Sequence, residues 1–385
     1  MTAPLDPASL MHYERFDVPG RPRLIFGPGS SARIGELARE LGARHALVVT
    51  DFGLVQAGHA TRISTALTAA GVGVTVFDRV RENPTTEDVA ACLATARKVP
   101  VDLLIGLGGG SAMDTAKATN FLLTNGGEMR DYWGVGKATQ PMLPFIAIPT
   151  TTGTGSEMQC AALIADAETH QKMACLDEKA LAQIALLDPL LTRTQPPRVA
   201  ACTGLDALSH AIESAVTTKR TPASLAFSRA AFELITDALP RLLARPDDAA
   251  RARMQLGAAF AGAAIERSML GAAHAAANPL TARFNLTHGF AVGLMLPGVI
   301  RFNAGDPAVR ARYREALPRE PEELAQEVAD HYALAHGPRF LRECGATVAD
   351  LPALAALAQK QWTAGFNPRP ITEADFAALY AAVLG

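Results

Sequence analysis

The sequence predicts an N-terminal α/β domain with a parallel sheet, followed by an all-α C-terminal domain. Short apolar runs alternate with helix-like stretches as far as Pro189, and such runs are absent beyond it. The chain has 385 residues, which is more than one hydrophobic core ordinarily accommodates. We therefore place the α/β domain at residues 1–190 and the helical domain at residues 191–385.

The predicted strands of the first domain are six short runs rich in Val, Ile and Leu. Helix-like stretches separate the first four of them, and strands that alternate with helices form parallel sheets covered on both faces. The runs are RLIFG (23–27), HALVVTD (45–51), GVTVFD (73–78), DLLIGLGG (102–109), FIAIPTT (145–151) and IALLDP (184–189).

The character of the sequence changes near Pro189. The segment LTRTQPPRVAA, at residues 191–201, is typical of a connection because of its paired prolines. Beyond it, Ala, Leu and charged residues recur at helical spacing through 198–265 and 321–385. The charged, proline-interrupted segment 304–322 is expected to be a surface connection.

Charge and composition exclude several classes of partner. The net charge is −2, from 36 basic and 38 acidic residues, so no basic surface for nucleic acid or anionic membranes is expected. The N-terminus lacks the apolar region of a signal peptide, and no run of about 18 apolar residues could span a bilayer. The five cysteines are scattered without a CxxC pair, which favours reduced thiols and a cytoplasmic location.

A glycine cluster separates a predicted strand from a predicted helix in LLIGLGGGSAMDTAKAT. Gly108, Gly109 and Gly110 let a ligand approach the backbone, and Ser111 with Asp114 resembles a capping box. A helix that begins here would direct free N–H groups at the turn, which suits a pyrophosphate. The spacing is not G-x-G-x-x-G, and a plain glycine turn is the alternative.

A second polar loop, IPTTTGTGSEM, follows the next strand. Both loops leave the C-terminal ends of parallel strands, where ligands usually bind, so together they favour a nucleotide site. Asp51 ends an earlier strand. A carboxylate at this place can bind a ribose diol and would repel a 2′-phosphate, which favours NAD over NADP. A helix N-cap is an equal alternative for Asp51.

Asp206 and His210 stand four residues apart in the small, apolar stretch GLDALSHAIESAV, so on a helix both side chains share one face. His274 and His288 follow in GAAHAAANPLTARFNLTHGFAVG, which contains a single charged residue, Arg283. One carboxylate and three neutral imidazoles can hold a divalent transition metal with a position open for substrate. Buried core histidines are the alternative interpretation.

Together these stretches resemble the iron-containing (group III) alcohol dehydrogenase family over nearly the whole chain. The resemblance implies the dehydroquinate synthase-like fold, an active site in the cleft between two domains, and a homodimer. The segments that carry it most specifically are GGGSAMDTAKA (108–118), PTTTGTGSEM (149–158), GLDALSHAIES (204–214) and HAAANPLTARFNLTHG (274–289).

The resemblance also implies a role for each matching residue. The metal is expected to be Fe2+, with Zn2+ as the alternative, and the positions that match its ligands are Asp206, His210, His274 and His288. The positions that match the NAD site are Gly108, Gly109, Gly110 and Ser111 at the pyrophosphate, Thr151, Thr152 and Thr154 beside the nicotinamide and ribose, Asp51, and Lys172 near the ribose.

One position departs from the family pattern. Many members have a histidine four residues after the third ligand, near the nicotinamide and substrate, whereas this chain has Asn278. Three interpretations remain open. In the first, the proton released in the reaction would leave through water or through hydroxyls such as those of Thr151 and Thr154. In the second, Asn278 positions a polar substrate, and Arg283 attracts an anionic one. In the third, Asn278 caps a helix end before Pro279.

The predicted function is reversible hydride transfer between NAD(H) and a primary alcohol or its aldehyde, as in a metal-dependent alcohol dehydrogenase. The alternatives are an NAD- and metal-dependent lyase of the dehydroquinate-synthase type, a reductase of a small anionic aldehyde or oxo acid, a metal-free maleylacetate-reductase-like enzyme, and a non-catalytic binding protein. The lyase uses a more polar and basic pocket than this sequence offers, and a metal-free enzyme would not need Asp206 and three histidines together.

Overall fold

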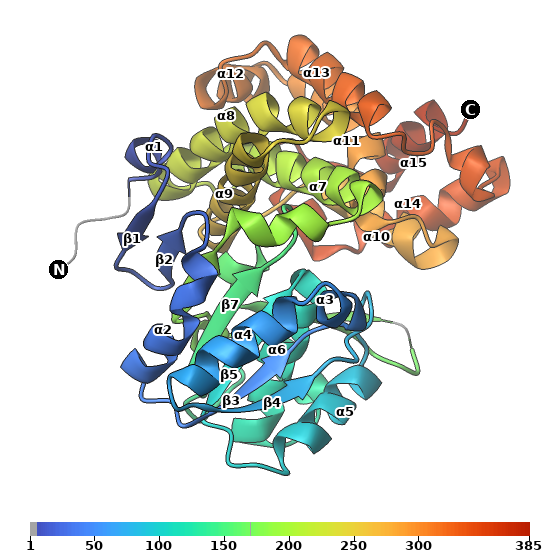
Figure 1. Cartoon of the computed structure of the whole chain (residues 1–385). Helices are drawn as coiled ribbons and strands as arrows, with labels where there is room; N and C mark the ends of the chain where they lie inside the picture. The colour runs from blue at the N-terminus through green and yellow to red at the C-terminus, as the bar shows by residue number, and fades with distance from the viewer. Residues whose placement is uncertain (1–5, 170) are drawn as a thin grey trace. The chain divides into compact units, whose positions relative to one another are not determined.

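The computed structural model describes residues 6–169 and 171–385, which form two compact units (Figure 1). The first unit comprises residues 12–151 and 155–195, and the second comprises 6–11, 152–154 and 196–385. The main boundary thus falls after Gln195, whereas the sequence predicts it after residue 190. The reason is that Asp188 binds the following turn to the first unit: its carboxylate accepts from the backbone N–H groups of Leu190 and Gly29.

The first unit contains a seven-stranded sheet in the order β1-β2-β10-β7-β5-β3-β4. Only β1 is antiparallel to its neighbour, and the six predicted strands are β2, β3, β4, β5, β7 and β10, each ending one or two residues before its predicted end. The strands are β1 (Phe16–Val18), β2 (Arg23–Phe26), β3 (His45–Val49), β4 (Gly73–Phe77), β5 (Leu103–Gly108), β7 (Phe145–Pro149) and β10 (Ile184–Leu187).

Helices cover both faces of this sheet, which explains why its central strands are continuously apolar. Along β3, Ala46 and Val48 pack in one hydrophobic cluster with α2 and α4, whereas Leu47 and Val49 pack in another with α5 and α6. This alternation is the two-residue period of a strand. The helices of this unit are α2 (Ile34–Glu40), α3 (Phe52–Gln56), α4 (His59–Ala69), α5 (Thr86–Ala96) and α6 (Gly110–Asn125).

A three-stranded sheet in the first unit was not expected from the sequence. Its order is β6-β9-β8, and Ile164 and Cys175 pack against Phe121 and Leu122 of α6. These strands are short, and their Ala and Cys residues give little β signal. They are β6 (Gly134–Val135), β8 (Ala161–Ala165) and β9 (Lys172–Leu176).

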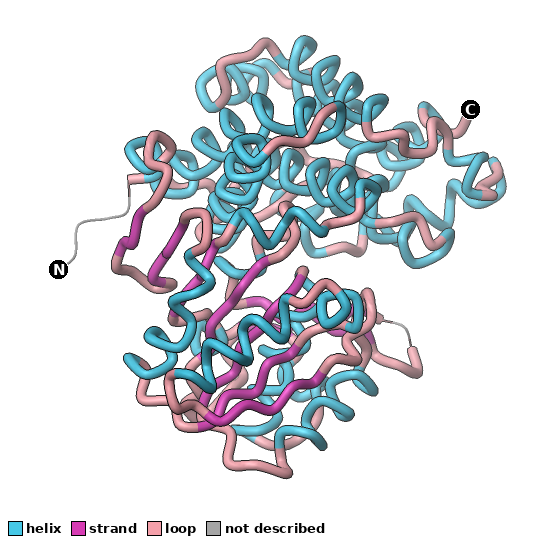
Figure 2. Tube along the Cα trace, in the orientation of Figure 1, coloured by secondary structure: helices cyan, strands magenta, loops and turns pink. Residues whose placement is uncertain are grey.

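The second unit consists of helices and loops, and the described strands all lie in the first (Figure 2). Small residues allow its helices to approach closely: a Cβ atom on Gly257 of α9 would lie 2.7 Å from Ile235 of α8. The helices are α1 (Pro7–Leu10), α7 (Pro197–Val216), α8 (Pro222–Ala244), α9 (Asp248–Glu266), α10 (Ala272–Phe284), α11 (His288–Ala304), α12 (Pro307–Ala316), α13 (Pro321–Leu334), α14 (Leu351–Gln359) and α15 (Glu373–Ala382). Among the described residues, no helix has both the length and the apolar character to cross a membrane.

The prediction that residues 304–322 form a surface connection is wrong in one respect, because this segment contains the helix α12. Asp306 caps this helix by accepting from the N–H groups of Ala308 and Val309, and Pro307 occupies the first helical position. An acidic N-cap followed by proline is a helix start, and the proline therefore begins a helix here where the prediction treated it as an interruption.

Lys117 joins α6 to the polar loop that follows β7. Its buried ammonium donates to the backbone carbonyls of Ser156, Gln159 and Ala161 at 2.7–2.9 Å, and to the Ser156 hydroxyl at 2.8 Å. Asp114, on the same helix, accepts from the Ser156 hydroxyl at 2.8 Å. The predicted capping box is therefore wrong: Gly109 is the N-cap of α6, with no side-chain cap, and Asp114 instead anchors this loop.

Glu157 lies buried in the same loop, and this burial raises its pKa from 4.5 to about 7. Because the folded-state pKa exceeds the unfolded one, the contribution of Glu157 to stability is fully present below pH 4.5 and is lost as pH rises through about 7. The ionised carboxylate therefore destabilises the folded protein in mildly alkaline solution.

We predict that Glu157→Gln, which stays neutral, raises the melting temperature more at pH 8 than at pH 5. The gain at pH 8 is at most about 3 kcal/mol, or several degrees. Thermal unfolding of both proteins at the two pH values measures it. Glu168→Gln, at an exposed position of the same unit, is the control. An equal change in melting temperature at both pH values would contradict the prediction.

Candidate functional site

Three histidines of the second unit surround the carboxylate of Asp206. The distances from Asp206 Oδ1 to the Nε2 atoms are 3.3 Å for His210, 3.5 Å for His274 and 3.8 Å for His288. Asp206 and His210 are one turn apart on α7, whereas His274 lies in the first turn of α10 and His288 begins α11. The structure thus brings together the four residues that the sequence singles out as metal ligands.

Close packing of α11 on α7 places His288 in this cluster. The next residue is Gly289, and a Cβ atom there would lie only 2.0 Å from the carbonyl oxygen of Cys202 on α7. Any side chain at position 289 would therefore push the start of α11 away from Asp206. His288 is also the most exposed member of the cluster, with 30% of its side chain accessible, so solvent reaches the site from its side.

The donor atoms of the cluster fit a divalent cation. Asp206, His210 and His274 are buried, and among the described residues Asp206 Oδ1 and His274 Nε2 are buried atoms without a hydrogen-bond partner. Leaving a carboxylate oxygen and an imidazole nitrogen unpaired in the interior is costly. Oxygen and nitrogen donors in this arrangement suit Fe2+ or Zn2+, which would satisfy both atoms.

The electrostatics of the cluster differ between its members, and they favour the deprotonated form of Asp206 and His210 but not of His274. Burial by itself would raise the pKa of Asp206, but His210, His274 and His288 together hold it well below the usual range. Burial lowers the pKa of His210 to about 4, so this imidazole is neutral at pH 7. Burial also acts to lower the pKa of His274, but its carboxylate neighbours raise it to about 9. Metal binding at His274 therefore has to displace a proton.

Sequence reasoning missed Glu213, which lies beside His274. Its carboxylate is 2.5 Å from His274 Nδ1, and both side chains are 5% exposed. A signal for it exists in the sequence: positions 206, 210 and 213 follow the i, i+4, i+7 spacing of one helix face. Glu213 therefore lies on the same side of α7 as the two predicted ligands.

The glycine cluster of the first unit forms the start of α6. Gly108 has φ +151°, and a Cβ atom on it would lie 2.7 Å from the Cβ of Ala112, so glycine is required there. Gly109 is the N-cap, and Gly110 and Ser111 open a helix of 16 residues whose first N–H groups and positive dipole end suit an anion. Thr151 lies beside this turn, since its side chain is 3.3 Å from the Cβ position of Gly109.

The other threonines and Lys172 occupy different places. Thr152 and Thr154 belong to the second unit, where Gly153 between them approaches α7 so closely that a Cβ atom would lie 2.3 Å from Thr203. Lys172 is exposed at the start of β9, and its charge acts to lower the pKa of Asp114 on α6.

Asp51 is the N-cap of α3, so the capping interpretation is confirmed. Its Oδ1 accepts from the N–H of Leu54 at 3.1 Å. Its Oδ2 lies 3.8 Å from the Cβ position of Gly108 and so faces the glycine turn. One carboxylate oxygen therefore serves the helix, and the other is directed toward the predicted nucleotide site.

Asn278 is not a helix cap, and that interpretation is wrong. It lies within α10, one turn after His274, and its Nδ2 donates to Oε1 of Gln361 at 2.9 Å. The helix continues through Pro279, because a proline interrupts one backbone bond without preventing the next turns from forming. Arg283 forms an ion pair with Asp350 at 2.7 Å, so its charge is already balanced.

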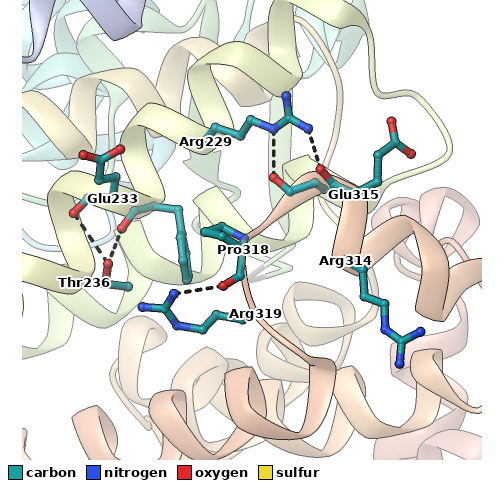
Figure 3. A pocket seen from close by; sticks show the side chains of 9 residues that line it. Arg229, Glu233, Thr236, Arg314, Glu315, Pro318 and Arg319 are labelled. Carbon is teal, nitrogen blue, oxygen red and sulfur yellow. Dashed lines mark hydrogen bonds between the residues drawn. The ribbon is translucent and has the colours of Figure 1, made fainter.

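A separate cavity of about 470 Å3 in the second unit contains none of these residues (Figure 3). Its arginines are already engaged. Arg229 donates to two backbone carbonyls, Arg314 pairs with Glu320, and Arg319 pairs with Glu327. Two of the three arginines are therefore already paired with carboxylates. Its lining residues are Arg229, Phe232, Glu233, Thr236, Arg314, Glu315, Ala316, Pro318 and Arg319.

Comparison with known proteins agrees with this architecture. Residues 21–189 match the family model described as iron-containing alcohol dehydrogenase, and residues 200–384 match the C-terminal model of the same family. The NAD-dependent methanol dehydrogenase of Bacillus methanolicus is 32% identical over 367 residues, which cover 92% of this chain and 96% of the relative. The lactaldehyde reductase of Escherichia coli K12 is 34% identical, with the same coverage. The crystal structure of a 1,3-propanediol oxidoreductase aligns with a TM-score of 0.88 at 30% identity, covering 97% of this chain and 100% of the other.

The chain thus has a parallel-sheet unit followed by a helical unit with a buried His and Asp cluster, and the matching family models and relatives are those of oxidoreductases. Within this class, the chain belongs to the iron-containing alcohol dehydrogenase family. The predicted family, fold class and oxidoreductase activity are confirmed, and the dehydroquinate-synthase-type lyase is not supported.

Proposed function

We propose that this protein catalyses reversible hydride transfer between NAD(H) and a small primary alcohol or its aldehyde. The observation that carries the proposal is the convergence of three histidines on the buried, unpaired Asp206 oxygen, in a chain of the iron-containing alcohol dehydrogenase family. The relatives named for methanol, lactaldehyde and 1,3-propanediol act on small molecules with a hydroxyl or carbonyl group, and one of them is named as NAD-dependent.

The second unit would hold the metal through Asp206, His210, His274 and His288. The family description supports Fe2+, and Zn2+ is the alternative because it binds such nitrogen and oxygen donors more tightly. When bound, a divalent metal acts as a Lewis acid toward the substrate oxygen and makes an alcohol easier to deprotonate. Three of the four side chains, those of Asp206, His210 and His274, are buried, and the partly exposed His288 would leave one side accessible to substrate.

The first unit would bind the dinucleotide. The N–H groups at the start of α6, from Gly110 and Ser111, would donate to the pyrophosphate, and the glycines before them leave room for it. Asp51 Oδ2 would accept hydrogen bonds from the adenosine ribose diol. The proposed cofactor residues of the first unit are Asp51, Gly108, Gly109, Gly110, Ser111, Thr151 and Lys172; Thr152 and Thr154, which the family resemblance also assigns to the cofactor, belong to the second unit.

The function is tested with metal-free protein that is reloaded with Fe2+ without oxygen. We predict that it oxidises NADH in the presence of a small aldehyde and reduces NAD with the corresponding alcohol. His274→Ala should lower turnover by at least about a thousandfold and lower the bound metal, because it removes one of the side chains that would hold the metal. NADH binding, measured by fluorescence, should persist in this variant because His274 belongs to the helical unit.

His12→Ala is the control for the loss of a histidine, since His12 is exposed and belongs to the other unit. A His274→Ala protein that kept full activity and a full equivalent of metal would show that the ligand assignment is wrong. Absence of NADH oxidation with every aldehyde of a broad panel would contradict the proposed activity.

The cofactor preference depends on Asp51. We predict that the unmodified protein prefers NAD(H), since a carboxylate and a 2′-phosphate repel each other at close range. Asp51→Asn keeps a side-chain oxygen for the α3 cap but removes the charge, and it should lower the ratio of kcat/KM for NAD over NADP by about tenfold or more. Steady-state kinetics with both cofactors measure this ratio. Equal kcat/KM for NAD and NADP in the unmodified protein would contradict the assignment.

Asn278 is the proposed substrate-side residue next to the metal ligands. Its amide has no accessible pKa, so in this proposal the proton released on alcohol oxidation leaves through water, while the bond to Gln361 holds the amide in place. We predict that Asn278→His adds an ionisation with a pKa of about 6–7 to the pH profile of kcat/KM. Gln361→Ala, which breaks the same hydrogen bond without adding an ionisable group, is the control. An unchanged profile in Asn278→His would contradict this role.

A further inference from the structure

We propose that Glu213 is a positioning residue that fixes the tautomer and orientation of His274, so that Nε2 presents its lone pair to the metal. The inference rests on the proposed metal-dependent function and extends it to a residue outside the ligand set. It is carried by the short contact between the Glu213 carboxylate and His274 Nδ1.

The geometry places the His274 ring between two carboxylates. Glu213 Oε2 lies 2.5 Å from Nδ1 on one side, and Asp206 Oδ1 lies 3.5 Å from Nε2 on the other. The first distance is that of a strong, charge-assisted hydrogen bond, whereas the second is too long for a well-formed one. The ring is therefore anchored through Nδ1, and Nε2 is directed at the centre of the cluster.

A neutral imidazole carries one proton, on either Nδ1 or Nε2. An ionised carboxylate only accepts hydrogen bonds, so Glu213 requires that proton on Nδ1. Nε2 is then left without a proton, which is the state that a metal ligand needs. A carboxylate on the far nitrogen of a ligating histidine also increases the basicity of the nitrogen that binds the metal.

The second oxygen of Glu213 holds the backbone that carries His274. Oε1 accepts from the N–H of Ala273 at 2.8 Å, in the first turn of α10. The N-cap residue is Gly271, which has no side chain to cap the helix, and a Cβ atom there would lie 2.9 Å from Glu213 Oε1. The carboxylate thus occupies space that glycine leaves open, at the positive end of the helix dipole.

The neighbouring N–H of this helix end has a different partner. Asn367 Oδ1 accepts from Ala272 N at 3.2 Å, and Asn367 also pairs with Asn303. Asn367 therefore caps α10 without a hydrogen bond to the His274 ring, whereas Glu213 binds both the helix end and the ring. This difference separates anchoring of the helix from control of the imidazole.

Glu213→Gln preserves the shape of the side chain but replaces one acceptor oxygen with an NH2 group. We expect the dissociation constants for Co2+ and Zn2+ to rise 10–100-fold, the usual effect of losing such a partner. Competition with a chelator on the purified full-length protein measures them, and the visible spectrum of the Co2+ form should change because the ligand geometry changes. Glu213→Asp, which keeps an acceptor-only carboxylate, should bind with intermediate affinity.

The control is Asn367→Ala, which removes the other cap of the same helix end. Its metal affinity should stay well above that of Glu213→Gln if Glu213 acts through the imidazole. Equal losses in both variants would mean that Glu213 only anchors α10, and this would overturn the inference. A metal affinity of Glu213→Gln equal to that of the unmodified protein would overturn it as well. If the unmodified protein itself bound no metal, the proposed function would fail instead.

A measurement that needs no variant of Glu213 guards against misfolding. In the metal-free protein with 15N-labelled histidine, the spectrum of the neutral imidazole should show His274 protonated at Nδ1, with the signal assigned by its loss in His274→Ala. A His274 protonated at Nε2 would overturn the inference.

Discussion

The helical unit is organised around one costly group, the buried carboxylate of Asp206. A carboxylate in an interior of Ala, Leu and Gly is stable only with compensating partners. Here three imidazoles, contributed by α7, α10 and α11, lie 3.3–3.8 Å from its Oδ1, and the proposed cation would be the compensating partner of this oxygen. The position of each of these helices is thus constrained by the distance from its histidine to a single oxygen atom.

Small residues make this convergence sterically feasible. Gly289 lets the start of α11 come close to the backbone of α7 at Cys202, and Gly271 leaves room for the Glu213 carboxylate at the start of α10. The Ala-rich composition of these helices has the same consequence, because short side chains allow close axes and leave the long ligand side chains room to meet. The small residues of these helices are therefore needed for the Asp and His side chains to meet.

In the first unit, a buried charged side chain likewise holds polar segments in place. Its apolar strands place two polar turns at the C-terminal ends of β5 and β7. Lys117, buried on α6, binds the carbonyls of the second turn and so connects it to the helix that begins at the first. A ligand that binds at the start of α6 would therefore lie at the turn after β5, and Lys117 attaches the turn after β7 to the same helix.

The sequence by itself determined the local elements and the chemical types at the site. Continuous apolar runs predicted the six parallel strands, and the occurrence of Asp206, His210, His274 and His288 in apolar stretches predicted a metal site. These signals are local, because strand burial and helix faces follow from neighbouring residues along the chain. The tertiary structure alone decided which side chains meet over long separations. In the tertiary structure Asp114 pairs with Ser156, Asn278 with Gln361, and His274 with Glu213. The pairing of β8 with β9 is a further contact of this kind. Such pairs depend on how helices and loops pack. Helical spacing places Glu213 on the same face as Asp206 and His210, but it does not show that His274 of another helix lies against it.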